Sequence, residues 1–150
     1  MREILFRGKP LGKIDKDFVF GSLGVIDTDL VAIYQCKEFT EDIKTLVDLG
    51  TVGQYTGLTD KNGIKIFEGD IIQTKKTGLK GEKNYRFVIK YGKYTPLEYC
   101  REIYSQWQTI GFYALDGKRE YQLSCCGDML EVIGNIHDNP ELLKSEVQGE

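Results

Sequence analysis

Short runs rich in apolar residues, separated by glycine and charged residues, occupy positions 1–35. The runs "REILFRG", "DFVFGSLGVI" and "LVAIYQC" each predict a β-strand, with an exposed loop over 9–17 and a turn at "DTD". The run "KEFTEDIKTLVDLG" fits either a helical face or a short strand, and we favour strand or irregular structure. Gly50 ends this run, so we expect an N-terminal β subdomain over 1–50 and a second subdomain over 51–150.

The most patterned stretch of the chain is "YTGLTDKNGIKIF", which predicts a β-hairpin. Asp60 favours the start of a type I turn and Gly63 the left-handed position after it, which together are typical of a three-residue loop with a glycine bulge. This register places Leu58 opposite Ile66, so one face of the hairpin is apolar and the other is exposed to solvent. A two-residue Asn-Gly turn would pair Leu58 with Phe67 and mix the faces, so the burial pattern favours the bulged form.

The run "FEGDII" follows directly and predicts a corner between two strands of a barrel. Gly69 interrupts the strand, and Asp70 can accept backbone N–H groups across the bend. No base or nucleophile stands at a recognisable spacing from Asp70, so we interpret it as structural rather than catalytic. We assign a structural role to eight residues of such turns and corners: Gly57, Asp60, Asn62, Gly63, Gly69, Asp70, Gly134 and Asn135.

Charge is unevenly distributed along the chain. The segment 75–94, "KKTGLKGEKNYRFVIKYGKY", has seven basic residues and one acidic residue, a net charge of +6. The whole chain carries −3, so the remainder carries −9. We expect a basic loop over 75–84, followed by a strand whose alternation places tyrosines on one face and cations on the other. Cations and rings on one segment are also what a single-strand nucleic-acid groove uses.

The segment "TPLEYCREIYSQW" has apolar residues at three- and four-residue steps, which predicts a helix near 96–107 with Trp107 packed inward. A hairpin around "DGK" and a last strand in "DMLEVIGNI" follow, and "DNPELL" predicts a short C-terminal helix. We therefore expect a mainly β (α+β) fold.

Candidate chemistry is sparse. Cys36, Cys100, Cys125 and Cys126 lack the paired spacing of a zinc site, so we expect thiols and no metal. His137 is the single histidine, and no phosphate-binding glycine loop is present. No cofactor is expected, and we predict that the protein is not an enzyme. No stretch is apolar enough for a membrane span or a signal peptide, so we expect a cytoplasmic protein without a membrane partner.

Three blocks occur in a familiar order: "REILFRGK", "TVGQYTGLTDKNGIKIFEGDII" and "EVIGNIHDNPELL". In these blocks the chain resembles the YopX family of small phage and prophage proteins. The resemblance implies a largely β structure with an SH3-type barrel in its C-terminal part, encoded by a phage or prophage of a Gram-positive bacterium. It supplies no established activity and no catalytic residues. The basic segment and the predicted helix lie outside the matching blocks, so the resemblance implies nothing about them.

Two functions remain as hypotheses. The leading one is a protein–protein interaction module, with self-association as one form, in which an SH3-type barrel presents a shallow groove lined by Tyr55, Tyr85, Tyr91 and Tyr94. The alternative is single-stranded nucleic-acid binding by 75–94. The candidate binding residues are Lys75, Lys76, Tyr85, Arg86, Lys90 and Tyr91.

Overall fold

A computed structural model describes residues 3–12, 17–36, 43–78, 81–95, 108–117, 119–123 and 129–143, with the backbone alone at 76–78 and 81–83. The chain divides into two compact units, Met1–Gly57 and Leu58–Glu150. Each unit builds a hydrophobic core of its own. Gly50, the expected boundary, lies in a 3-10 turn, η1 (Leu49–Thr51).

The first unit is an antiparallel sheet in the order β4-β3-β2-β1-β5. Its strands are β1 (Phe6–Gly8), β2 (Val19–Asp27), β3 (Leu30–Gln35), β4 (Ile43–Val47) and β5 (Gly53–Thr59). One face carries the core, which consists of Val31, Ile33 and Val47 with Phe6, Val19, Leu23 and Val52 packed against them. The ambiguous run that ends at Gly50 contains β4, so the preference for a strand there is confirmed.

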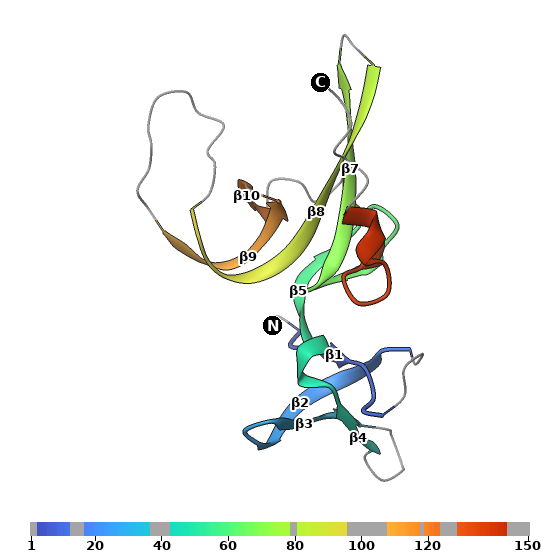
Figure 1. Ribbon diagram of the computed structural model, residues 1–150, viewed down its shortest axis with the longest axis vertical. Helices are drawn as coiled ribbons and strands as arrows, with labels where there is room; N and C mark the ends of the chain where they lie inside the picture. Colours follow the sequence, from blue (N-terminus) through green and yellow to red (C-terminus); the bar gives the residue numbers. More distant parts are fainter. Residues whose placement is uncertain are drawn as a thin grey trace. The chain divides into compact units, whose positions relative to one another are not determined.

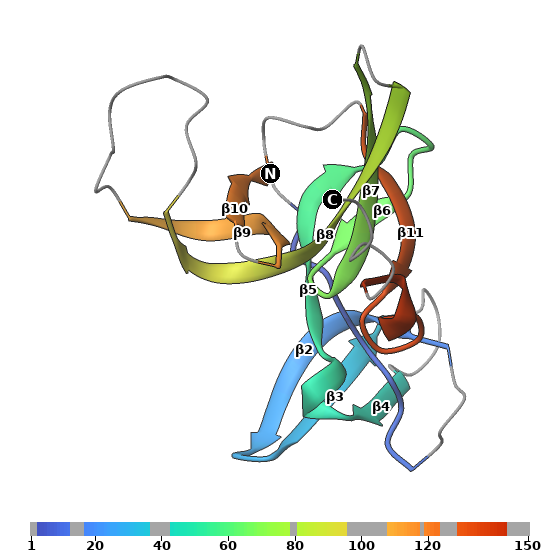
Figure 2. The same ribbon diagram turned by 45° about the horizontal axis from the view of Figure 1, so that its top comes forward.

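The second unit is built on a five-stranded antiparallel sheet in the order β10-β9-β8-β7-β11. Its strands are β7 (Asp70–Gly78), β8 (Gly81–Tyr94), β9 (Thr109–Asp116), β10 (Arg119–Gln122) and β11 (Glu131–Asn135). The long strand β8 curves strongly, so the sheet forms a half-barrel, and β11 lies along β7 (Figures 1 and 2). The short strand β6 (Lys65–Phe67) pairs with β5, and a 3-10 turn, η4 (Pro140–Leu143), follows β11.

The core of the second unit lies on one face of the half-barrel. Its buried members are Ile66, Ile72, Phe87, Ile89, Ala114, Leu123 and Leu130, and Leu58 packs against them. Ile71, on the opposite side of β7 from Ile72, is also fully buried. In the central hairpin Ile66 and Phe67 are buried and Leu58 is half-buried, whereas Ile64 is 49% exposed.

The mainly β class is confirmed, because the described part of the chain consists of two antiparallel sheets with short 3-10 turns. The expectation of a loop over 75–84 is wrong for its described residues, since Lys75 lies opposite Asn84 and Gly78 opposite Gly81 in the β7–β8 ladder. Backbone pairing there overrides the loop-like composition of lysine and glycine. The expected helix at 96–107 with Trp107, and Cys100, Cys125 and Cys126, lie outside the described residues. The SH3-type barrel stays a prediction.

Candidate functional site

The turn between β5 and β6 has the predicted bulged form. The amide of Gly63 donates to the carbonyl of Asp60 at 3.0 Å, and the amide of Asp60 donates to the carbonyl of Ile64 at 2.8 Å. Gly63 has a φ of 80°, the left-handed conformation that a glycine bulge needs. Counted outward from the Asp60–Ile64 pair, Leu58 lies opposite Ile66, so the prediction for this hairpin is confirmed.

The carboxylate of Asp60 joins this turn to β11. Its Oδ1 accepts the amides of Asn62 at 2.8 Å and Ile64 at 2.9 Å, and its Oδ2 accepts the amide of Val132 at 3.0 Å. Burial alone would raise the pKa of Asp60, which is 5% exposed. The hydrogen bonds from Val132, Ile64 and Asn62 outweigh that effect and hold the pKa of Asp60 below its ordinary value, because they stabilise the charged form.

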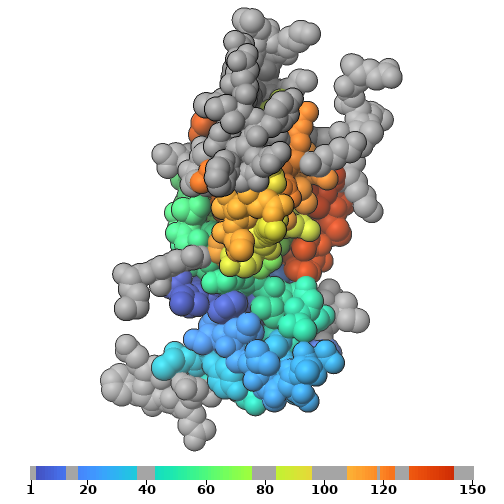
Figure 3. All heavy atoms as spheres, turned by 90° about the vertical axis from the view of Figure 1, so that its left-hand side faces the viewer, coloured from blue at the N-terminus to red at the C-terminus, as the bar shows by residue number. Residues whose placement is uncertain are grey.

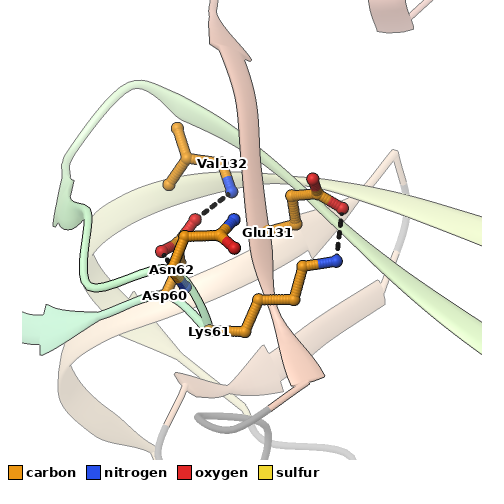
Figure 4. A network of polar contacts seen from close by, with 5 residues as sticks. All are labelled: Asp60, Lys61, Asn62, Glu131 and Val132. Carbon is orange, nitrogen blue, oxygen red and sulfur yellow. Dashed lines mark hydrogen bonds and ion pairs between the residues drawn. The ribbon is translucent and has the colours of Figure 1, made fainter.

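Lys61 makes a second link from the same turn to the same strand. Its amide donates to the carbonyl of Leu130 at 3.0 Å, and its Nζ pairs with Oε2 of Glu131 at 2.7 Å (Figure 4). β11 is an edge strand of the five-stranded sheet, and edge strands present unpaired backbone groups to other chains. The turn thus occupies part of the edge of β11, and the chemistry of Asp60 and Lys61 is used inside the unit.

The corner between β6 and β7 uses its acidic residue in the same way. Oδ2 of Asp70 accepts the amide of Phe67 at 2.7 Å, and Asp70 is 2% exposed. The amide of Gly69 donates to the carbonyl of Ile89, and the carbonyl of Gly69 accepts the amide of Ile136, each at 2.9 Å. The corner therefore ties β7 to β8 and to the segment that follows β11.

A third turn, after β11, is organised by Asn135. Its Oδ1 accepts the amides of His137 and Asp138, each at 3.0 Å. A Cβ at Gly134 would lie 2.5 Å from Oδ1 of Asn139, so the close approach of Asn139 requires glycine there. His137 is half-buried within this turn. Gly57, on β5, has a φ of 89°.

The candidate binding residues of 75–94 divide between the two faces of the sheet. Lys75, Arg86 and Lys90 occupy register positions of one face, and Tyr85 and Tyr91 those of the other. Tyr85 and Tyr91 are also six residues apart on one strand, which places them about 20 Å from each other. The rings and the cations of this set thus occupy opposite faces of the sheet.

Arg86 is used within the second unit. Its Nη1 donates to the carbonyl of Leu142 in η4 at 2.8 Å, and its Nε donates to Oε1 of Gln73 at 3.2 Å. Lys75 and Lys90 are exposed, whereas the side chain of Lys76 lies outside the described set. Of the tyrosines expected to line a groove, Tyr55 and Tyr94 are buried, Tyr85 is at the margin of exposure and Tyr91 is 53% exposed.

Tyr91 belongs instead to a surface that the sequence analysis missed, which we name the ribbon patch and define as Tyr91, Lys93, Ile110 and Phe112. Tyr91 lies opposite Phe112 and Lys93 opposite Ile110 in the β8–β9 ladder, so the four share one face. The rings of Tyr91 and Phe112 meet edge to face with centroids 5.0 Å apart. Ile110 is 71% exposed and Lys93 is exposed. Strands β8 and β9 adjoin each other at the surface in Figure 3.

Three further findings complete the description of the site. Among the described residues, no group of three or more His, Cys, Asp or Glu side chains could hold a metal ion. Cys36 is exposed. In the ranges that the structure describes, no helix is both long and apolar enough to cross a membrane.

The fold and its turns define a class of protein: two antiparallel β units in sequence, the second a half-barrel whose edge strand β11 is held by an aspartate-centred hairpin turn. The chain belongs to the YopX family, because the model of the YopX protein matches residues 24–144. It is also similar to the crystal structure of protein EF1440 from Enterococcus faecalis, with a TM-score of 0.53 and 21% identity over 95% of this chain and 99% of that one. This likeness supports the fold alone. No curated protein matches the chain.

Proposed function

We propose that this protein is a non-enzymatic protein–protein interaction module that acts in phage or prophage biology in the cytoplasm of a bacterial host. The ribbon patch is the surface through which it binds. One observation carries the proposal: Tyr91 and Ile110, both exposed, lie on one face of paired strands beside Phe112 and an exposed Lys93. Clustered exposed apolar side chains mark surfaces that a partner covers.

The conformation of the patch suits recognition. Its four residues stand on two paired strands, so their positions are fixed before a partner arrives and little conformational entropy is lost on binding. Aromatic residues are enriched at the centres of interfaces, where they supply a large contact area. Tyr91, with Phe112 packed against it, is the natural anchor.

The acidic residues support a non-enzymatic role. Asp60 and Asp70 are the buried carboxylates that a catalytic reading would select, and both accept backbone amides within the second unit. The pKa of Asp60 is lowered, whereas a general acid or base at neutral pH needs a raised carboxyl pKa. These carboxylates act on the fold rather than on a substrate.

Site-specific photocrosslinking in cells that carry the phage or prophage tests the proposal. A benzophenone amino acid at position 91 or 110 should crosslink to a protein, because both side chains point out of the patch. The matched control is position 84, since Asn84 is exposed on the same strand outside the patch. Equal crosslinking at 84, or no protein crosslink at 91 and 110, would overturn the proposal.

Nucleic-acid binding is the second function, favoured by the +6 charge of 75–94. A labelled single-stranded oligonucleotide titrated at low and high salt distinguishes it from the first. Steep loss of affinity with salt and with Lys75→Glu would favour nucleic acid, whereas no binding at low salt would discard it. Lys75 is the suitable residue to change, because it is exposed and lies outside the ribbon patch.

A further inference from the structure

We infer that one occupant of the ribbon patch is a second copy of this chain, which docks through the tip of its β2–β3 hairpin. The inference rests on the proposed function of the patch and names its partner. We define the hairpin tip as Val25, Ile26, Asp27 and Asp29, which lie at the turn between β2 and β3. Complementary chemistry of the two surfaces carries the inference.

The hairpin tip exposes apolar side chains. Val25 is 74% exposed and Ile26 is 41% exposed. The pairing of β2 with β3 shifts register between Val25 and Asp27, which leaves Ile26 as the extra residue of a β-bulge. A bulge re-aims side chains from the regular alternation. Two successive aliphatic side chains are thus presented at the end of a narrow two-stranded hairpin, a shape suited to insertion against a strand surface.

The hairpin tip and the ribbon patch carry opposite charges. Residues 17–36, which contain the whole β2–β3 hairpin, include three aspartates and no lysine or arginine. The ribbon patch includes one cation, Lys93, and no acidic residue, because Arg86 and Lys90 occupy register positions of the opposite face of β8. Opposite charges at the rim of an interface steer association and suppress wrong partners.

In the proposed contact, apolar side chains pack on apolar side chains and opposite charges face each other. Val25 and Ile26 of one copy pack on Tyr91, Phe112 and Ile110 of the next, and Asp29 faces Lys93. Asp27 has a local role as well, because its Oδ1 accepts the amide of Thr28 at 2.7 Å. The contact is heterologous, since a different surface is used on each copy. Such contacts generate closed rings or open chains rather than two-fold dimers.

Charge reversal with sedimentation velocity over a range of protein concentrations tests the inference. Lys93→Glu and Asp29→Lys should each weaken self-association by about tenfold, because each places like charges together. The double variant, with both charges exchanged, should regain association. Lys75→Glu is the matched control and should associate as the wild type does. Far-ultraviolet circular dichroism verifies that each variant is folded.

Mixing the two single variants gives the sharpest result. The Lys93→Glu chain has acidic residues at both surfaces and the Asp29→Lys chain has lysine at both, so each contact between the two different chains joins opposite charges. A mixture should therefore regain association that neither single variant shows alone. A wild type whose mass is independent of concentration, or an association that neither reversal weakens, would overturn the inference. Crosslinking from position 91 to another protein, unaffected by Asp29→Lys, would then leave the proposed function standing.

Discussion

The β5–β6 turn and the ribbon patch are both on the second unit, and they use their polar and apolar residues in opposite ways. In the turn, Asp60 and Lys61 direct their side chains and amides to β11 over short distances. In the ribbon patch, Lys93 and Ile110 are exposed, and the ring of Tyr91 packs edge to face on Phe112. One region holds the unit together, and the other is the surface that we propose for a partner.

The comparison shows that the most strongly patterned part of the sequence is not the part that we propose for binding. The turn lies in the most patterned stretch of the chain, yet its residues are engaged by the backbone of a neighbouring strand. The ribbon patch has a weaker sequence pattern, because its residues come from two strands that residues 95–108 separate in the sequence. The strong local pattern of the turn reflects constraints of folding, whereas the exposed cross-strand cluster is where we propose binding. Mutations should therefore separate stability from association.

The largest effect on stability is expected from Asp60→Ala. It removes the acceptor of three amides and should lower the free energy of unfolding by about 3 kcal/mol. Asp60→Asn keeps one acceptor oxygen for the turn but leaves the contact with β11 weakened, so its cost should be smaller, about 1–2 kcal/mol. Urea unfolding followed by circular dichroism measures both. Lys61→Met is the control, expected within about 0.5 kcal/mol because its ion pair is exposed.

The pH dependence of stability should identify the same carboxylate. Because the pKa of Asp60 is lowered in the folded state, its contribution is fully present above the pKa of the unfolded chain, about 4, and is lost as pH falls through the folded value. The stability difference between wild type and Asp60→Asn should therefore be largest near neutrality and shrink below about pH 4. A difference that stays constant down to pH 2.5, or that grows, would contradict the assignment.

A smaller effect is expected from Arg86→Met. This change removes the hydrogen bond to the carbonyl of Leu142 and should cost about 1–2 kcal/mol. It should also speed proteolysis near η4, which limited digestion with mass spectrometry detects. Lys90→Met serves as the control, because Lys90 is exposed on the same face of β8. If both variants behaved as wild type, the anchoring role of Arg86 would be incorrect.

The smallest stability effect is expected from Ile110→Thr. Because Ile110 is 71% exposed and threonine keeps the β-branched shape, the free energy of unfolding should change by less than about 0.5 kcal/mol. Self-association should nevertheless weaken by about fivefold, since the variant removes apolar area from the patch. Thr59→Ser, on the exposed side of the central hairpin, should change neither quantity. If Ile110→Thr lowered the free energy of unfolding but left self-association unchanged, Ile110 would belong to the scaffold and not to the contact surface.

Local features were predictable from the sequence because their determinants are neighbours in the chain. The bulged turn follows from Asp60 and Gly63, and the acceptor role of Asp70 from a bend three residues long. Burial of Ile66 follows from period-two alternation in the hairpin. The family resemblance and the mainly β class were predictable for the same reason.

Long-range features were not predictable. The amide of Val132 is 72 residues from Asp60, and the carbonyl of Leu142 is 56 residues from Arg86. Arg86 was therefore assigned to binding although it anchors η4. The ribbon patch was missed because Ile110 and Phe112 face Tyr91 and Lys93 only once the register of β8 with β9 is known. The one available signal was the cation-containing, acid-free pair of runs "KYGKY" and "TIGFY".

Hydrogen exchange measured at low and high protein concentration tests the central division between scaffold and contact surface most directly. The account predicts that, as concentration rises, exchange slows at residues 25–29 and at 90–94 and 109–112, while it stays unchanged at 60–64. Protection that rises at 60–64 instead, or that rises nowhere while the chain assembles, would contradict it.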